Sequence, residues 1–234
     1  MGEEATRAHR LYRVMAAQIE QAGYAVLRFD YRGTGDSAGA DDDATLHSWL
    51  NDIECAAGEL RAGSGAAQVL VVGLRVGGLL AALVERRGQF RFQHFVLWDP
   101  VVEGLAYLQE LTSAHRAFMS EEIGATKWKD RLQIDARGVA DEALGMRLTA
   151  KLVDELCAAD LTAALPRAGN VTIICTRESA AMNRLRQSIS ATPSAHWIDM
   201  CSSSDWNSDA ALNNATVPMD VVRTVVARIQ ECSP

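Results

Sequence analysis

The order of apolar and polar residues along the chain predicts helices and strands in alternation. Apolar residues return every three or four positions through residues 6–22, the period of an amphipathic helix, and Gly23 gives a stop. The run YAVLRFD at residues 24–30 predicts a strand. The other predicted elements are helices at 44–62, 76–87, 180–190 and 218–231 and strands at 68–73, 92–98, 170–176 and 195–200.

This alternation predicts the fold class. Strands that alternate with helices are typical of an α/β protein with a doubly wound, mostly parallel sheet. One stretch interrupts the pattern, because residues 101–166 show helical periodicity and no strand candidate. We interpret 101–166 as a helical lid inserted between late strands, with 1–100 and 167–234 forming the core.

A glycine-framed turn is the most distinctive local feature. The segment VLVVGLRVGGLLAAL, residues 69–83, joins a buried β-run to an apolar helix through Gly73-x-x-x-Gly77. This is the frame of a nucleophile elbow, whose middle position normally holds Ser, Cys or Asp. That position holds Arg75. We expect Arg75 to occupy the tight turn, with its side chain directed toward the lid-covered pocket, because the two glycines let strand and helix approach closely.

Four segments carry a resemblance to a known family: GYAVLRFDYRGTGDSAG, WLNDIECA, VLVVGLRVGGLLAAL and FVLWDPVVEGLAYLQEL. They resemble the α/β-hydrolase superfamily, and within it the serine-aminopeptidase-like group that includes the exosortase-A-associated hydrolases. The similarity is strong over residues 3–111 and weaker but collinear beyond. It implies an α/β-hydrolase-like core with a lid between late strands and, more loosely, a hydrolase activity.

The family's catalytic positions hold unusual residues in this sequence. The resemblance assigns Arg75 to the nucleophile position and Glu178 to the acid position after the next-to-last strand. The loop after the last strand, where relatives carry a histidine, contains Cys201 and Asp205. No histidine follows His196, which begins that strand. Because removing Ser or His from a triad costs about a million-fold in turnover, ordinary Ser-His-Asp hydrolysis is disfavoured.

The N-terminal region departs from the family as well. The resemblance places Gly2 and Glu3 in a turn whose backbone helps to form the oxyanion hole, and Val76 directly follows the elbow residue. The strand that normally lies between those at 24–30 and 68–73 is absent. Either the chain is shortened at its N-terminus relative to its relatives, or these two strands pair directly.

Arg75 has two interpretations, and both stay open. A guanidinium at a helix N-terminus offers a fork of donors to a carboxylate or phosphate. Alternatively, Arg75 closes an obsolete pocket by pairing internally with an acidic residue such as Asp30, Asp99 or Glu178. Asp99, which follows a strand in the segment Trp-Asp-Pro, is also a candidate for a structural role at the hinge of the lid.

Two other residues are candidate nucleophiles. A reactive thiolate at Cys201 would need an electropositive setting, which Arg75 could supply, and the ordinary alternative is a buried, inert thiol. The serine of GDSAG, Ser37, matches the nucleophile pattern in letters. An acidic loop follows it instead of a helix, so we expect Ser37 to cap a turn.

Composition excludes several classes of partner. The net charge is −7 without a Lys/Arg-rich block, so neither a nucleic acid nor an anionic membrane is an expected partner. No run approaches the roughly 18 apolar residues of a membrane span. Five cysteines without CxxC spacing predict reduced thiols, a cytoplasmic location and no structural zinc. We expect neither a metal nor a cofactor.

Two functions stay open. The resemblance favours a hydrolase-family enzyme with non-standard chemistry that acts on an acyl or carboxylated small molecule. The residue inventory favours a catalytically silent protein that binds an anion, a partner protein or a second copy of itself. The candidate catalytic residues are Arg75, Glu178, Cys201 and Asp205, and the candidate ligand-binding residues are Arg75, Gly2, Glu3, Val76 and Asp99.

Overall fold

The computed structural model of the chain describes residues 1–122, 132–165, 170–190, 192–201 and 217–232. Its helices are α1 (Glu3–Gln21), η1 (Asp41–Asp43), α2 (Leu46–Ser64), α3 (Val76–Arg87), α4 (Gly104–Glu122), α5 (Ala150–Cys157), α6 (Leu161–Ala164), α7 (Ala180–Ile189) and α9 (Met219–Glu231). Its strands are β1 (Leu70–Leu74), β2 (His94–Trp98), β3 (Glu142–Ala143), β4 (Met146–Arg147), β5 (Asn170–Cys175) and β6 (Ala195–Asp199).

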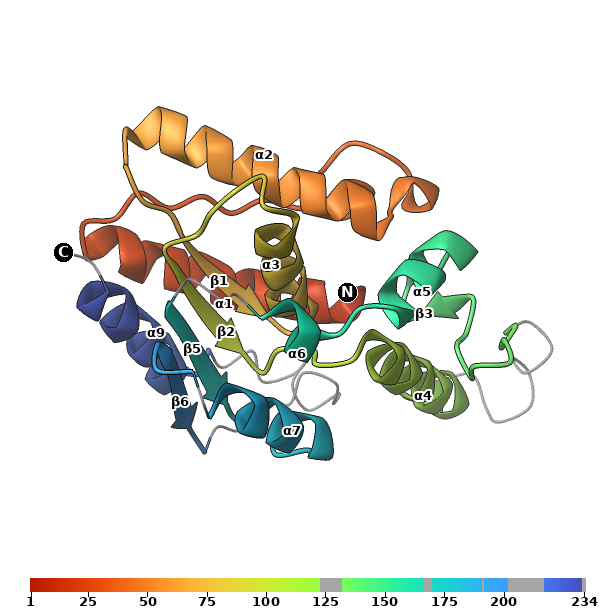
Figure 1. The fold of residues 1–234 in the computed structure, drawn as a ribbon. Coiled ribbons are helices and arrows are strands. Elements are labelled where there is room, and N and C mark those ends of the chain that lie inside the picture. The colour runs from red at the N-terminus through yellow and green to blue at the C-terminus, as the bar shows by residue number, and fades with distance from the viewer. Residues whose placement is uncertain (123–131, 166–169, 191, 202–216, 233–234) are drawn as a thin grey trace.

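A parallel sheet lies at the centre of the molecule (Figure 1). Its strand order is β1-β2-β5-β6, and each neighbouring pair is parallel. The predicted α/β class with a parallel sheet is therefore confirmed. The carboxyl ends of β1, β2 and β5 meet at one edge of the sheet, which places the loops after them together.

Helices cover both faces of the sheet. Along β2, Phe95 and Leu97 join a core shared with α2 and α3, whereas Val96 and Trp98 join a second core shared with α1 and α9. All four side chains are almost fully buried. A strand covered on both faces reads as a continuous apolar run rather than an alternating one, which explains the sequence HFVLW.

The segment between β2 and β5 contains α4, the β3–β4 hairpin, α5 and α6. Helices α4, α5 and α6 lie within residues 101–166, where a lid was expected, and the hairpin was not predicted. That this segment acts as a lid stays a prediction. Its turn residues Leu144 and Gly145 have φ of 48° and 76°, as a two-residue hairpin turn requires. Leucine is not a residue that favours such a turn, so the sequence gives little sign of it.

The predicted strand at 24–30 is wrong. This segment is extended but belongs to neither sheet, and among the described residues it does not pair with β1. Val26, Leu27 and Phe29 are 37–40% exposed. Strand propensity mainly measures how well a residue packs on a pleated surface, so apolar residues without a hydrogen-bonding neighbour do not make a strand.

Candidate active site

Arg75 occupies the turn between β1 and α3, as predicted. Its φ and ψ are 52° and −122°, a conformation that costs about 1–3 kcal/mol for a residue with a side chain. The main chain holds this conformation with three hydrogen bonds of 3.1 Å. The N–H of Arg75 donates to the carbonyl of Trp98, and its own carbonyl accepts from the N–H groups of Gly78 and Val101.

Two glycines allow β1 and α3 to approach closely at this turn. A Cβ on Gly73 would lie 2.6 Å from the Cα of Gly78, and a Cβ on Gly78 would lie 3.0 Å from Pro100. A Cβ on Gly77 would meet nothing within 4 Å. The expected role of Gly77 is therefore wrong, because Gly78 is the residue of α3 that faces the strand.

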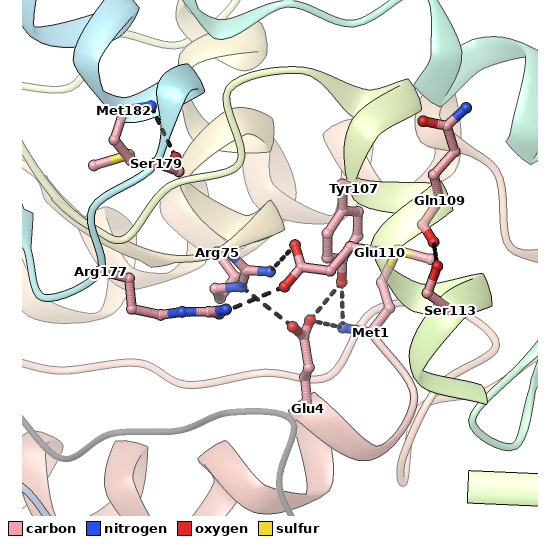
Figure 2. Close-up of polar contacts among 10 residues, drawn as sticks. All are labelled: Met1, Glu4, Arg75, Tyr107, Gln109, Glu110, Ser113, Arg177, Ser179 and Met182. Carbon is pink, nitrogen blue, oxygen red and sulfur yellow. Dashed lines mark hydrogen bonds and ion pairs between the residues drawn. The ribbon is translucent and has the colours of Figure 1, made fainter. Parts of the chain in front are cut away.

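The side chain of Arg75 is held by two carboxylates from distant segments (Figure 2). Its Nε lies 3.2 Å from an oxygen of Glu4 on α1, and its Nη2 lies 2.8 Å from an oxygen of Glu110 on α4. Only 12% of the Arg75 side chain is exposed. Burial alone would lower the pKa of this guanidinium, but Glu4 and Glu110 outweigh burial and raise it, so Arg75 carries a permanent charge with two partners.

Glu4 is the more deeply buried of the two carboxylates that hold Arg75. Its second oxygen accepts hydrogen bonds from the Tyr107 hydroxyl at 2.5 Å and from the amino group of Met1 at 3.1 Å. Burial by itself raises the pKa of Glu4, but the Met1 ammonium, Arg75 and the Tyr107 hydroxyl lower it to about 2. Glu4 is therefore an anion at neutral pH and a poor proton acceptor.

Glu110 connects the elbow to the loop after β5. One of its oxygens contacts Arg75, and the other lies 3.5 Å from the Nη1 of Arg177. Figure 2 shows both guanidinium groups directed toward this carboxylate, each on a different oxygen. Tyr107 and Glu110 lie three residues apart on α4, so both reach the elbow from one face of the helix. Burial and the neighbouring Glu4 raise the pKa of the Tyr107 hydroxyl well above its ordinary value.

The acidic partners predicted for Arg75 are wrong. Asp99 is buried and accepts hydrogen bonds from Thr176, at 2.7 Å from its backbone N–H and also from its hydroxyl. Asp99 therefore joins the end of β2 to the end of β5. Glu178 is exposed, and within the described residues it forms no ion pair with Arg75. Asp30 accepts from the N–H of Asp36 in its own loop.

The remaining predicted catalytic residues lie beyond the last strand. Cys201 follows β6 and is exposed, so it is not the buried thiol of the ordinary alternative. Asp205 lies outside the described residues. Ser37 donates its hydroxyl to the carbonyl of Asp30 at 2.5 Å, and its N–H donates to Thr34 at 3.1 Å. The expectation that Ser37 stabilises a turn is confirmed.

The structure brings part of the predicted ligand-binding set together. Gly2, Arg75 and Val76 line one cavity, whereas Asp99 does not line it. Gly2 has a φ of 53° and packs its Cα near the β3–β4 turn, where a Cβ would lie 2.7 Å from the carbonyl of Leu144. Glu3 lies in the first turn of α1. Roles for these residues in binding a ligand stay predictions.

No histidine forms a hydrogen bond or an ion pair with the side chain of Arg75 in the described structure. All five histidines of the chain lie in the described residues, and none of them contacts the Arg75 side chain. His196 pairs with Thr172 within the sheet. His94 is the first residue of β2 and is buried, and its Nε2 lies 3.0 Å from the hydroxyl of Thr172. The partners of the Arg75 side chain among the described residues are therefore carboxylates, and none of them is a histidine.

Sequence reasoning missed four members of the cluster. Glu4, Tyr107, Glu110 and Arg177 were not candidates, although the first directly follows the predicted Gly2-Glu3 turn and the last directly precedes Glu178. The i, i+3 spacing on α4 was a usable signal. The sequence does not show that Arg75 and Glu4 meet in the fold, because 71 positions separate them along the chain.

Two further features concern the described residues, namely metal-ligand groups and membrane spans. His, Cys, Asp and Glu side chains do not gather in groups of three or more suited to a metal ion anywhere in the part of the chain that the structure describes. None of the helices in this part combines the length and the apolar composition that crossing a bilayer requires.

Comparisons with known proteins agree with the fold. The family model for serine aminopeptidase, S33, matches residues 1–169. The chain is similar to Est1E from Butyrivibrio proteoclasticus bound to ferulic acid, with 16% identity, a TM-score of 0.65 and coverage of 95% and 83% of the two chains. The chain is also similar to proline iminopeptidase of Mycobacterium smegmatis, with 14% identity and a TM-score of 0.61. This alignment covers 99% of this chain and 87% of the other.

A third neighbour is tomato methylketone synthase I in complex with 2-tridecanone, at 13% identity and a TM-score of 0.58, with coverage of 96% and 94%. At such identities the likeness extends to the fold alone. No curated protein matches the chain.

Proposed function

Because the chain belongs to the serine aminopeptidase S33 family and yet carries Arg75 at its elbow, we propose that it is a catalytically silent member that acts by binding rather than by hydrolysis. The observation that carries the proposal is the closure of the elbow by Glu4 and Glu110. A guanidinium has no lone pair to attack a carbonyl and does not lose its proton in proteins. The position that starts the chemistry in an α/β-hydrolase therefore holds a structural cation.

The surroundings of the elbow support the same proposal. A triad needs a base within hydrogen-bond reach of the nucleophile and a third group that orients the base. Glu4, the carboxylate that contacts the Nε of Arg75, is paired and has a pKa of about 2. It is therefore a weak base at neutral pH. The described histidines make no contact with Arg75.

We assign Arg75 the role of a clamp between three segments. It links the start of α3 to α1 through Glu4 and to α4 through Glu110, and its guanidinium lies 5.5 Å from the centre of the Tyr107 ring. A fork of donors suits this task, because one arginine can hold two carboxylates at fixed angles. In this role the clamp holds the lid segment against the core.

A carboxylated or acyl small molecule is the second candidate ligand. Arg177 favours it, since its side chain is 40% exposed and its contact with Glu110 is long, at 3.5 Å. A ligand carboxylate could take the place of Glu110 at Arg177, whereas Arg75 is already committed to two anions. This candidate is a binding function and needs no triad.

A hydrolysis assay tests the proposal. Purified protein is incubated with p-nitrophenyl acetate and, separately, with a fluorophosphonate probe that labels activated serines. We expect hydrolysis at the uncatalysed rate and no labelling. The matched variant Arg75→Ser restores the nucleophile in the elbow and is expected to stay inactive, because no histidine activates it.

The contrary result is specific. If the wild-type protein hydrolyses the ester, and Ser37→Ala or Cys201→Ala removes the activity, the protein is an enzyme and the proposal fails. Binding of acetate or benzoate that Arg177→Gln weakens, with hydrolysis absent, would instead favour the second candidate.

A further inference from the structure

The carboxylate of Glu110 is shared by two arginines that come from different loops. Arg75 follows β1 and places its Nη2 at 2.8 Å from one oxygen of this carboxylate. Arg177 follows β5 and places its Nη1 at 3.5 Å from the other oxygen. Figure 2 shows both guanidinium groups directed toward Glu110. We call Arg75 and Arg177 the arginine pair.

The arginine pair has the geometry of a carboxylate site. Each guanidinium contacts a different oxygen of Glu110, so the two donors together bind both oxygens of one planar group. Arginine forms strong, charge-assisted hydrogen bonds with carboxylates, and its rigid fork of donors fixes their orientation. Glu110 supplies that carboxylate from α4. Another carboxylate in the same place would meet the same two donors.

The three side chains differ in how firmly they are held. Arg75 is only 12% exposed, and its Nε also contacts Glu4 at 3.2 Å. Glu110 and Arg177 are 35% and 40% exposed, and Glu110 is the ion-pair partner of Arg177 within the described residues. An ion pair with such exposure is weak, because water screens both charges and competes for them. Glu110 is therefore the replaceable member of the contact.

Glu110 can leave the arginine pair while α4 stays in place. Tyr107, three residues earlier on this helix, donates its hydroxyl to Glu4 at 2.5 Å. Thr112, two residues later, accepts a hydrogen bond from the N–H of Ala140 at 3.0 Å. Neither contact involves Glu110. Exposed side chains change rotamer quickly and without rearrangement of the fold, so rotation of the Glu110 side chain is enough to vacate its position.

From these contacts we infer that Glu110 is an internal ligand of a carboxylate-binding site, which a small-molecule carboxylate enters by displacing Glu110 from Arg75 and Arg177. The inference rests on the proposed binding function and names its ligand class and the residue that controls access. Arg75 keeps two anionic partners in both states, because Glu4 stays and the ligand replaces Glu110. Binding is an exchange of one carboxylate for another.

The charges around the arginine pair favour a carboxylate over a phosphate. Glu4 shares Arg75 with the site, and its pKa of about 2 keeps it negatively charged at neutral pH. A phosphate group carries up to two negative charges at neutral pH, and repulsion by Glu4 grows with each charge that the ligand brings. A carboxylate brings one charge, the same as the group that it replaces.

The first test measures binding of sodium benzoate by isothermal titration calorimetry at fixed ionic strength. Glu110→Gln retains the size of the side chain and removes the competing charge. An internal ligand lowers the apparent affinity by the fraction of time for which the site is vacant. We expect Glu110→Gln to bind benzoate about fivefold more tightly than the wild type, which corresponds to about 1 kcal/mol. Unchanged or weaker binding would overturn the inference.

Glu103→Gln is the matched control. Glu103 directly precedes α4, its side chain is also 35% exposed, and it pairs with a different arginine, Arg184. The variant makes the same change in net charge at the same exposure. We expect it to leave the affinity for benzoate unchanged. If Glu103→Gln tightens binding as much as Glu110→Gln does, net charge explains the gain and the inference fails.

A double variant tests whether the gain depends on the arginine pair. Glu110→Gln combined with Arg177→Gln should lose the whole gain, because the ligand then lacks one of its two donors, and such coupling is what a double-mutant cycle measures. Retention of the gain would overturn the assignment of Arg177. A crystal structure of Glu110→Gln with benzoate locates the ligand directly. A benzoate carboxylate on Arg75 and Arg177 supports the inference, and benzoate bound elsewhere contradicts it.

Three further probes test the class of ligand on the Glu110→Gln variant. Benzamide has the shape of benzoate without its charge and should bind at least tenfold more weakly. Inorganic phosphate and a capped glycine–glutamate–glycine peptide should each bind more weakly than benzoate. Benzamide equal to benzoate would show that the site does not select an anion. Tighter binding of phosphate or of the peptide would overturn the small-molecule carboxylate as the ligand.

An ester assay on the same preparations separates this inference from the proposed function. Hydrolysis of p-nitrophenyl acetate by the wild-type protein would refute the catalytically silent protein and leave the site controlled by Glu110 in place. Absence of hydrolysis together with equal benzoate affinity of wild type and Glu110→Gln would refute the site alone.

Discussion

The strand β1 borders two regions of opposite character. At its carboxyl end, Arg75, Glu4 and Glu110 form a closed cluster in which each charge faces an opposite charge. Along its other edge, Leu70 and Val72 line an apolar cavity that residues 24–30 border on the opposite side. The charged region is closed by contacts within the chain, whereas the side chains of Val26, Leu27 and Phe29 in the cavity wall are 37–40% exposed. The turn at the carboxyl end of β1 is therefore the tightly packed region, and the cavity wall is the loosely packed one.

The largest effect is expected at the buried carboxylate of the cluster. Glu4→Gln leaves Arg75 largely buried without one of its two partners, and breaking a buried ion pair on one side costs about 3–5 kcal/mol of unfolding free energy. Glu110→Gln is the control, because the Glu110 side chain is 35% exposed, and it should cost about 1 kcal/mol or less. Urea denaturation measures both. Equal losses of unfolding free energy in the two variants would mean that burial does not set how much each carboxylate contributes to stability.

Acid is expected to weaken the closed region next. The pKa of Glu4 is lowered from 4.5 to about 2 in the folded protein, so its contribution is fully present above pH 4.5 and is lost as the pH falls toward 2. This difference corresponds to at most about 3 kcal/mol. Denaturation at a series of pH values measures it, and Glu4→Gln should make the curve flatter below pH 4.5. An unchanged slope would contradict the assigned partners.

Sequence reasoning predicted the fold well wherever an apolar run had a neighbour to pair with. The strands at 70–74 and 170–175 lie within two residues of their predicted positions, since both are buried between helices and read as continuous apolar runs. The segment 24–30 has the same local character and failed to become a strand. Whether such a segment forms a strand depends on a neighbouring strand to pair with, and the local sequence pattern does not show whether that neighbour is present.

In the candidate site, too, local features were predicted correctly and contacts between distant segments were not. The position of Arg75 followed from the glycine frame, because the frame is local. Its partners Glu4 and Glu110 did not follow, because they come from α1 and from α4 and are joined to Arg75 only by tertiary packing. The predicted partners Asp99 and Glu178 were chosen from the ends of strands, and the chain uses Asp99 to join two of those ends instead.

A smaller effect should distinguish the two glycines of the elbow. Gly73→Ala places a Cβ 2.6 Å from the backbone of Gly78, and relieving such a contact costs about 1–3 kcal/mol. Gly77→Ala meets open space in a helix and should be neutral or stabilising by up to about 1 kcal/mol. Thermal denaturation of the two variants compares them. A loss at Gly77 equal to that at Gly73 would show that the close approach has been assigned to the wrong residue of α3.

The smallest effect on stability is expected in the open region, where one chemical change can be compared at two sites. Val96→Thr puts a hydroxyl into a fully buried position of β2, at a cost of about 1–3 kcal/mol. Val26→Thr makes the same change on a side chain that is 37% exposed in the wall of the cavity, and it should alter the unfolding free energy by less than about 0.5 kcal/mol. Urea denaturation of the two variants measures the difference, because burial of the new hydroxyl is what separates them. A loss at Val26 equal to the loss at Val96 would show that residues 24–30 are packed as tightly as the sheet.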